Sequence, residues 1–164
     1  MKKIKRIIAA GLCLSMVFAA TACSKSDKSA SGGSSDKDKT YNVGICQLVE
    51  HEALDAATKG FKDALTEKLG DKVTFTEQNA AGDTPTCATI IDGFVSSNVD
   101  LILANATSPL QAAASATTTI PVLGTSITDY ATALDMSDWS GKTGRNISGT
   151  SDLAPLSEQA AMLH

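Results

Sequence analysis

The sequence lacks the short motifs by which many enzymes are recognised. It contains no nucleophile elbow, no glycine-rich phosphate-binding loop and no complete set of metal ligands. A catalytic site needs such groups in a defined mutual arrangement, and none is visible along the chain. These absences predict a protein that is not an enzyme and that uses neither a metal ion nor another cofactor.

Positive charge is scarce beyond the first 22 residues. All eighteen acidic residues follow Cys23, whereas only ten of the fourteen basic residues do, so that part of the chain has a formal net charge of −8. A nucleic-acid-binding protein needs basic side chains to neutralise phosphates. The charge balance therefore excludes nucleic acid as a partner.

The apolar run near the start of the chain, over residues 7–20, is too short to span a bilayer comfortably. Four basic residues precede it, and the letters ATAC that end at Cys23 follow from residue 20. This is the layout of a secretory signal, and its end resembles the lipobox cut by the lipoprotein signal peptidase. We expect residues 1–22 to be a signal peptide and Cys23 to carry lipid. An uncleaved membrane anchor or a buried amphipathic helix is the alternative.

The segment after Cys23 has no large apolar side chain. Residues 24–39 are serine, glycine, lysine, aspartate and alanine alone. Such a composition cannot bury enough surface to offset the entropy lost on ordering. We therefore expect residues 23–40 to form a flexible tether that holds the protein at the outer face of the cytoplasmic membrane.

From residue 41, short apolar and β-branched runs alternate with helical patterns. The expected strands are Tyr41–Leu48, Lys72–Gln78, Leu101–Ala104, Pro121–Thr125 and Gly144–Thr150. The expected helices are Glu52–Leu69, Thr84–Val95, Ser108–Thr117 and one from Pro155 onward, with an irregular or briefly helical stretch over residues 127–139. Thr84 and Ser108 each precede a proline, which favours them as helix N-caps. The alternation predicts an α/β fold with a doubly wound parallel sheet.

Ligands of such sheets bind beyond the carboxyl ends of the strands, near the switch in strand order. The residues that follow the expected strands therefore form one predicted binding rim: Gln47, Glu50, His51, Asn79, Ala80, Thr107, Ser108, Thr125 and Ser126. The helix expected at Ser108 would also direct free N–H groups and the positive end of its dipole toward the rim. That arrangement suits a carboxylate.

Some rim residues have a second interpretation. His51 and Asp55 are spaced like paired metal ligands, although a third ligand is not evident. Glu50, Glu52 and Asp55 could also simply occupy a first helical turn, where the dipole favours negative charge. Ligand contact, first-turn electrostatics and a metal site stay open for this segment. Ser108 could likewise be only a cap, or a cap that also binds an anion.

Two cysteines lie in the part predicted to fold. Cys46 falls in an apolar strand and Cys87 in the first turn of a helix. Outside the cytoplasm they could form a disulfide, or they could be separately buried thiols that act as small hydrophobic residues.

Several phrases of the sequence, taken together, resemble a known family. They are EHEALD over residues 50–55, ATKGF over 57–61, NAAGD over 79–83, ATSP over 106–109 and TD at 128–129. Their order and spacing are similar to those of the solute-binding lipoproteins of ABC importers related to the tryptophan- and tyrosine-binding proteins, which have the type I periplasmic-binding-protein fold. The resemblance runs from Tyr41 to the last residue.

The resemblance implies capture of a small solute, in this family often an aromatic or other amino acid, for an ABC-importer membrane permease. The solute would lie in a cleft between two lobes that close on it. Thr107 and Ser108 would hold its carboxylate. Further contacts are implied for Glu50, His51, Asn79 and, with less support from the motifs, Thr125 and Asp129.

The chain departs from the family at His164, where it stops inside the helix expected to cross to a second lobe. Residues 41–164 are therefore expected to be the N-terminal lobe of a two-lobed protein. Two other functions stay open: a ligand-sensing accessory protein that docks on a membrane receptor, and an enzyme that uses His51 with a neighbouring carboxylate.

Overall fold

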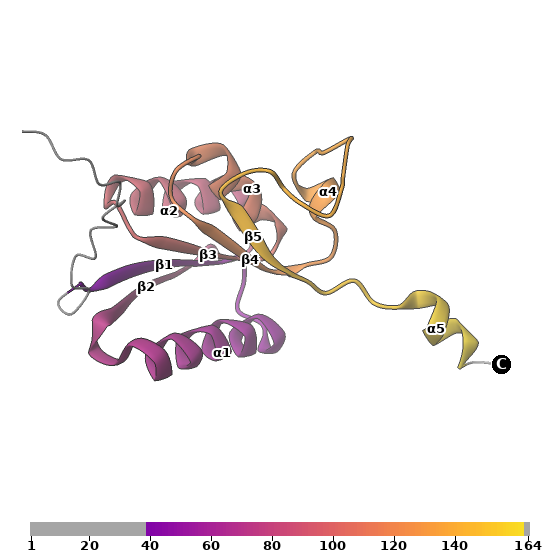
Figure 1. The fold of residues 1–164 in the computed structure, drawn as a ribbon, viewed down its shortest axis with the longest axis horizontal. Coiled ribbons are helices and arrows are strands. Elements are labelled where there is room, and N and C mark those ends of the chain that lie inside the picture. The colour runs from indigo at the N-terminus through magenta and orange to yellow at the C-terminus, as the bar shows by residue number, and fades with distance from the viewer. Residues whose placement is uncertain (1–38, 163–164) are drawn as a thin grey trace, which may run out of the picture. The chain divides into compact units, whose positions relative to one another are not determined.

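The computed structural model describes residues 39–162 (Figure 1). The predicted signal peptide, the lipidation at Cys23 and nearly all of the predicted tether lie outside the described residues. From Tyr41 onward, strands and helices alternate along the chain. None of the helices within residues 39–162 is long and apolar enough to cross a membrane.

The centre of the fold is a parallel sheet of five strands in the order β2-β1-β3-β4-β5. The strands are β1 (Tyr41–Gln47), β2 (Val73–Asn79), β3 (Leu101–Asn105), β4 (Val122–Ile127) and β5 (Ile147–Ser151). All pairs are parallel, with Gln47 opposite both Asn79 on β2 and Asn105 on β3. The chain moves outward from β1 to β2 and then returns past β1 to β3, so the order reverses at β1. This confirms the predicted doubly wound parallel sheet.

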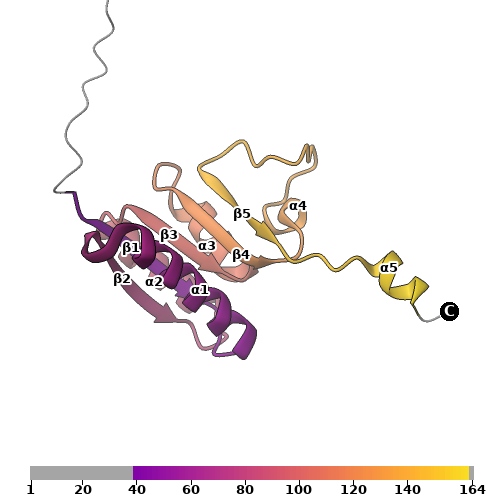
Figure 2. The ribbon, with the colours of Figure 1, turned by 60° about the horizontal axis from the view of Figure 1, so that its bottom comes forward.

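Helices cover both faces of the sheet. They are α1 (Glu52–Leu69), α2 (Thr84–Ser96), α3 (Thr107–Ala116), the short α4 (Tyr130–Ala133) and α5 (Leu156–Ala161), with a 3₁₀ turn η2 (Gly70–Lys72) after α1. Helix α1 lies on one face and α2 and α3 on the other (Figure 1). Figure 2 shows α1 running across the side of the sheet that contains β1 and β2.

The alternation of side chains along β1 divides the core into two layers. Val43 and Ile45 face α1 and pack with Val73 and Leu103. Cys46 belongs to the larger layer beneath α2 and α3, which includes Phe94. Gly44 also faces that layer, and a Cβ atom there would lie 2.6 Å from the Phe94 ring. The helix on that face can approach β1 closely because this residue has no side chain.

Two predicted helix caps are wrong. The N-cap of α2 is Asp83, one residue before Thr84, because its carboxylate accepts hydrogen bonds from the Thr86 N–H at 2.9 Å and the Thr86 hydroxyl at 2.6 Å. Helix α3 begins at Thr107, and Ser108 is not its cap. Its N-cap position is Ala106, which has a φ of 103° and supplies no side-chain hydrogen bond.

The remaining boundaries differ little from the predictions. Helix α1 matches its predicted range, and the short helix α4 lies within the stretch predicted to be irregular or briefly helical. The fifth strand begins at Ile147 rather than at Gly144, because Gly144 adopts a φ of 62° that interrupts an extended backbone. Glu50 precedes α1, so only Glu52 and Asp55 stand in its first turn.

Candidate functional site

The carboxyl ends of four neighbouring strands meet at one edge of the sheet. Backbone hydrogen bonds join the segments that leave them: Ala80 N–H to the Gln47 carbonyl at 2.9 Å, Leu48 N–H to Asn105 at 3.2 Å, and Ala106 N–H to Thr125 at 3.0 Å. The structure therefore brings together the segments that carry the predicted rim residues. We call residues 47–51, 79–83, 105–108 and 125–129 the rim.

The rim residues differ in their access to solvent. Glu50, His51, Asn79, Thr107 and Asp129 are exposed, and Ser108 and Thr125 are half-buried. Gln47 and Ala80 are buried, with 4% and 1% of their surfaces exposed. The exposed members are available to a solute, whereas Gln47 and Ala80 lie beneath the surface that they support.

His51 is the N-cap of α1. Its ring nitrogen Nδ1 accepts a hydrogen bond from the Ala53 N–H at 3.2 Å, which assigns the proton of the neutral ring to Nε2. The Nδ1 lone pair is therefore engaged with the helix. Within residues 39–162 no three His, Cys, Asp or Glu side chains come close enough to share a metal ion.

Asn79 shapes the loop after β2. Its side-chain oxygen accepts a hydrogen bond from the Ala81 N–H at 2.8 Å, and Ala81 and Gly82 both have positive φ values. The residues that follow Asn79 therefore form a turn. The side-chain NH₂ group of Asn79 makes no hydrogen bond with the described part of the chain, which leaves two donors for a solute.

Helix α3 begins at the rim without a side-chain cap, unlike α1, α2 and α4, whose caps are His51, Asp83 and Asp129. The first N–H groups of α3, which has 10 residues, therefore have no side-chain acceptor. The Ser108 hydroxyl accepts a hydrogen bond from Thr84 at 3.3 Å, which links α3 to α2. The helix start can receive an external anion.

Asp129 is engaged locally. Its carboxylate accepts hydrogen bonds from the Thr132 hydroxyl at 2.7 Å and from the Ala131 N–H at 2.9 Å. Both bonds hold the pKa of the Asp129 carboxyl below its usual range, and the bond from Thr132 has the larger effect. Asp129 is therefore the N-cap of α4.

Thr125 lies at the border of an apolar groove of about 410 Å³ on the α1 side of the sheet. Phe61, Leu103 and Leu123 are among the residues that line this groove. The Thr125 hydroxyl accepts a hydrogen bond from Thr150 at 3.4 Å. Half-buried Thr125 thus borders an apolar surface, unlike the exposed polar residues of the rim.

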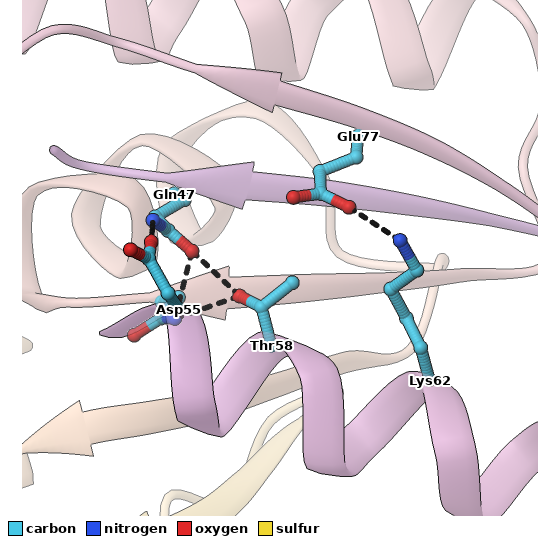
Figure 3. A network of polar contacts seen from close by, with 6 residues as sticks. Gln47, Asp55, Thr58, Lys62 and Glu77 are labelled. Carbon is cyan, nitrogen blue, oxygen red and sulfur yellow. Dashed lines mark hydrogen bonds and ion pairs between the residues drawn. The ribbon is translucent and has the colours of Figure 1, made fainter. Parts of the chain in front are cut away.

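A buried polar network lies directly beneath the rim (Figure 3). Gln47 joins Thr58 and Asp55: its side-chain oxygen accepts from the Thr58 hydroxyl at 2.7 Å, and its nitrogen donates to Asp55 at 2.6 Å. Asn105 donates to Thr58 at 2.9 Å and accepts from the Ser126 hydroxyl at 2.8 Å. Gln47 and Ser126 are members of the predicted rim, whereas Asn105 and Thr58 are not among its predicted residues.

Cys46 and Cys87 are free thiols and both are fully buried. They form no disulfide with each other, in agreement with the interpretation as two buried thiols that act as small hydrophobic residues. Burial is the main cause that raises the pKa of Cys46, to about 12. Burial also raises the pKa of Cys87. A raised pKa disfavours the thiolate, which is the reactive form of cysteine.

Comparison with known proteins places the chain among transport proteins. The family model for ABC transporter substrate-binding proteins matches residues 42–164. A tyrosine-binding protein of Clostridioides difficile is 44% identical over 158 residues, which are 92% of this chain and 45% of that protein.

Two solved structures are also similar to this chain. A ligand-free, open substrate-binding protein with adhesive properties from Clostridium difficile has a TM-score of 0.70 at 39% identity, over 76% of this chain and 43% of that one. A domain from Streptococcus pneumoniae in complex with L-Trp has a TM-score of 0.63 at 34% identity, over 69% and 39% of the two chains. The chain thus spans less than half the length of these relatives.

Proposed function

Because this chain belongs to the family of ABC transporter substrate-binding proteins, we propose that residues 41–164 form the N-terminal lobe of a protein that captures a small amino-acid-like solute for an ABC importer. The observation that carries this proposal is the uncapped start of α3 at the rim. Its free N–H groups and dipole suit the carboxylate of an amino acid.

The rim also offers groups for an ammonium ion. Glu50 is exposed after β1, and its carboxylate makes no hydrogen bond within the described residues. It lies on the same edge of the sheet as the start of α3, since Leu48 N–H is bonded to Asn105. An α-amino acid carries both a carboxylate and an ammonium group, so one rim can bind both charges. Asn79 and His51 would contribute neutral polar contacts beside them.

An aromatic amino acid is the solute class that the relatives favour. The curated relative is named a tyrosine-binding protein, and the Streptococcus pneumoniae structure contains L-Trp. The apolar contacts that an aromatic ring requires would come in part from a second lobe, because this chain covers 45% of the curated relative.

We further propose that the protein is a lipoprotein. The supporting observations are the basic and apolar stretch of residues 1–22, the small residues before Cys23 and the tether composition that follows. Lipid on Cys23 would keep the lobe at the outer face of the cytoplasmic membrane, near the permease that receives the solute. Mass spectrometry of the protein from membranes tests this, because an unlipidated Cys23 contradicts it.

The test of solute binding is isothermal titration of the two-lobed protein with tyrosine and tryptophan. Tyramine, which lacks the carboxylate, and 3-(4-hydroxyphenyl)propionate, which lacks the ammonium group, are the matched controls. Both amino acids should bind, and each control should bind at least about tenfold more weakly, since each loses a charge-assisted contact. If no amino acid from a full panel binds, the proposal is wrong. Capture of a receptor without a permease in a membrane pull-down would instead favour the accessory protein.

A further inference from the structure

Asn105, the last residue of β3, is fully buried, and its side chain makes four hydrogen bonds, as many as that of Gln47. Its nitrogen donates to the Leu54 carbonyl at 2.8 Å, to the Thr58 hydroxyl at 2.9 Å and, more weakly, to Gln47 at 3.4 Å. Its oxygen accepts from the Ser126 hydroxyl at 2.8 Å. Both ends of this amide are therefore satisfied inside the lobe.

These bonds reach three different segments. Leu54 and Thr58 lie on the first turns of α1, Gln47 ends β1, and Ser126 lies near the end of β4. Asn105 itself is followed by Ala106 and the start of α3. One side chain thus connects the strand ends and helix starts that carry the exposed rim residues.

The orientation of the Gln47 amide follows from this arrangement. Its oxygen accepts from Thr58 and Asn105, so its NH₂ group must face the other way. That group donates to the Val49 carbonyl at 3.0 Å and to the exposed Asp55 carboxylate at 2.6 Å. A directed chain of hydrogen bonds therefore runs from buried Asn105 through Gln47 to a charge at the surface.

The segments held by Asn105 would not adopt their conformations without restraint. Ser126 has a φ of 57° and Ala106 a φ of 103°, values that residues with a side chain rarely adopt. The Ser126 hydroxyl bond to Asn105 holds the first bend, and the second bend follows Asn105 directly. Such strained positions persist where surrounding contacts determine them.

We infer that Asn105 is a positioning residue for the rim: its buried amide fixes the ends of β1 and β4 and the first turns of α1 relative to the start of α3. This inference rests on the proposed function, because it assigns to Asn105 the preorganisation of the groups that meet the solute. Asn105 itself would not touch the solute, since none of its surface is exposed.

Hydrogen exchange in the absence of solute tests the inference. The rim amides Leu48 and Ala106 report on the carboxyl edge of the sheet, and Asp100 and Val122 report on the opposite edge, where they bond to Asn42 and Asn146. In Asn105→Ala the rim amides should exchange about tenfold faster or more, because local opening loses at least one buried hydrogen bond. The amides of the opposite edge should keep their rates.

Asn146→Ala is the matched control. Asn146 is an asparagine whose side chain also makes hydrogen bonds, at the opposite edge, where it donates to the carbonyls of Thr117 and Ile120. Asn146→Ala should accelerate hydrogen exchange at the Val122 amide and leave exchange at the Leu48 and Ala106 amides unchanged. Equal acceleration at both edges in Asn105→Ala, or unchanged rim amides, would overturn the inference.

Thr58 provides a gentler variant in case Asn105→Ala does not fold. Thr58→Val keeps the shape and removes the hydroxyl, and should accelerate the rim amides alone. Thr58→Ser keeps the hydroxyl and should preserve their exchange rates. If Val and Ser behave alike, packing rather than the hydrogen-bond network determines the rim, and the inference is wrong.

Titration with tyrosine in the two-lobed protein separates this inference from the proposed function. Thr58→Val should weaken binding about tenfold, whereas Asn146→Ala should not change it. The variants could change hydrogen exchange at the rim as expected while the two-lobed protein binds no amino acid. That result would contradict the proposed function and not the positioning role of Asn105. Unchanged affinity in Thr58→Val despite faster rim exchange would overturn the positioning role.

Discussion

At the scale of single residues, His51 shows how one side chain can be explained without a reactive role. Its ring accepts the Ala53 N–H as the cap of α1, and the acidic residues Glu52 and Asp55 follow in the first turn. The capping bond and the helix dipole account for this composition. What remains available at His51 is the Nε2 proton, which can donate a hydrogen bond to a solute.

Gly44 and Gly93 form a matched pair for substitution by alanine. A Cβ atom at Gly44 would lie 2.6 Å from the Phe94 ring, whereas a Cβ atom at Gly93 would meet nothing within 4 Å. Gly44→Ala should therefore lower the free energy of unfolding by roughly 1–3 kcal/mol through overpacking. Gly93→Ala, inside α2, should raise it by roughly 0.5–1 kcal/mol. Urea denaturation followed by circular dichroism measures both, and a tolerated Gly44→Ala would contradict the close packing of α2 on β1.

The buried thiols predict a loss of stability at alkaline pH. Burial raises the pKa of Cys46 to about 12, so the folded protein holds its proton where the unfolded chain releases it. A raised folded pKa means that the stabilisation is complete below the pKa of the unfolded thiol and is lost as the pH rises toward the folded value. Unfolding by urea should therefore become easier from about pH 9 upward.

The control for the pH dependence is the double variant Cys46→Ala with Cys87→Ala. It should lose the part of the alkaline destabilisation that comes from the thiols and keep the part due to Tyr130, whose pKa burial also raises. Identical pH profiles for the two proteins would show that the thiols do not contribute.

At the scale of elements, the start of α3 is unusual among the helices. The backbone of Ala106 turns with a φ of 103° and a ψ of 169° and no side chain caps the helix. This region of φ and ψ is almost restricted to glycine. Because the alanine side chain has no acceptor, the first N–H groups of α3 have no side-chain partner at the place where the proposed carboxylate would bind.

Ala106→Gly should relieve that strain. We expect the free energy of unfolding to rise by about 1 kcal/mol, since the relief exceeds the extra entropy of glycine in the unfolded chain. Ala88→Gly, at an exposed position inside α2, is the control and should lower it by about 1 kcal/mol. Thermal or urea denaturation gives both values. A destabilised Ala106→Gly would mean that the turn is not strained.

Most elements could be predicted from the sequence because their signals are local. The apolar spacing of α1 and the apolar runs of the strands depend on neighbouring residues, so their predicted ranges agree with the structure to within a few residues. The cap of α2 was misplaced because Asp83 and Thr84 are both good caps, and the choice depends on backbone geometry. The network of Asn105 and Thr58 joins residues 47 positions apart, and no local pattern reveals such a contact.

At the scale of the whole molecule, the described lobe has a part that contributes little to its packing. Residues 153–162, which include α5, are exposed throughout, with 67% of Leu156 and 78% of Met162 accessible to solvent. Figure 1 shows α5 standing apart from the sheet. The stability of the lobe therefore comes from the elements up to β5.

Removal of residues 153–164 should leave the free energy of unfolding within about 0.5 kcal/mol of that of the longer chain, because few buried contacts are lost. Removal of residues 147–164 is the comparison: it deletes β5 and the buried Ile147, which pairs with Val122. That shorter chain should be clearly destabilised. Circular dichroism during heating measures both. A large loss on the first truncation would show that α5 packs against the lobe.

The buried network beneath the rim has a consequence for engineering. Asn105, Gln47 and Thr58 hold the framework from inside, while Glu50 on the loop after β1 and Asn79 at the end of β2 are exposed. The residues proposed to face a solute and those that keep the scaffold in shape are therefore largely separate. A library that varies Glu50, Asn79 and Thr107 while leaving the three buried side chains untouched offers a direct route to altered solute preference in a lobe that still folds.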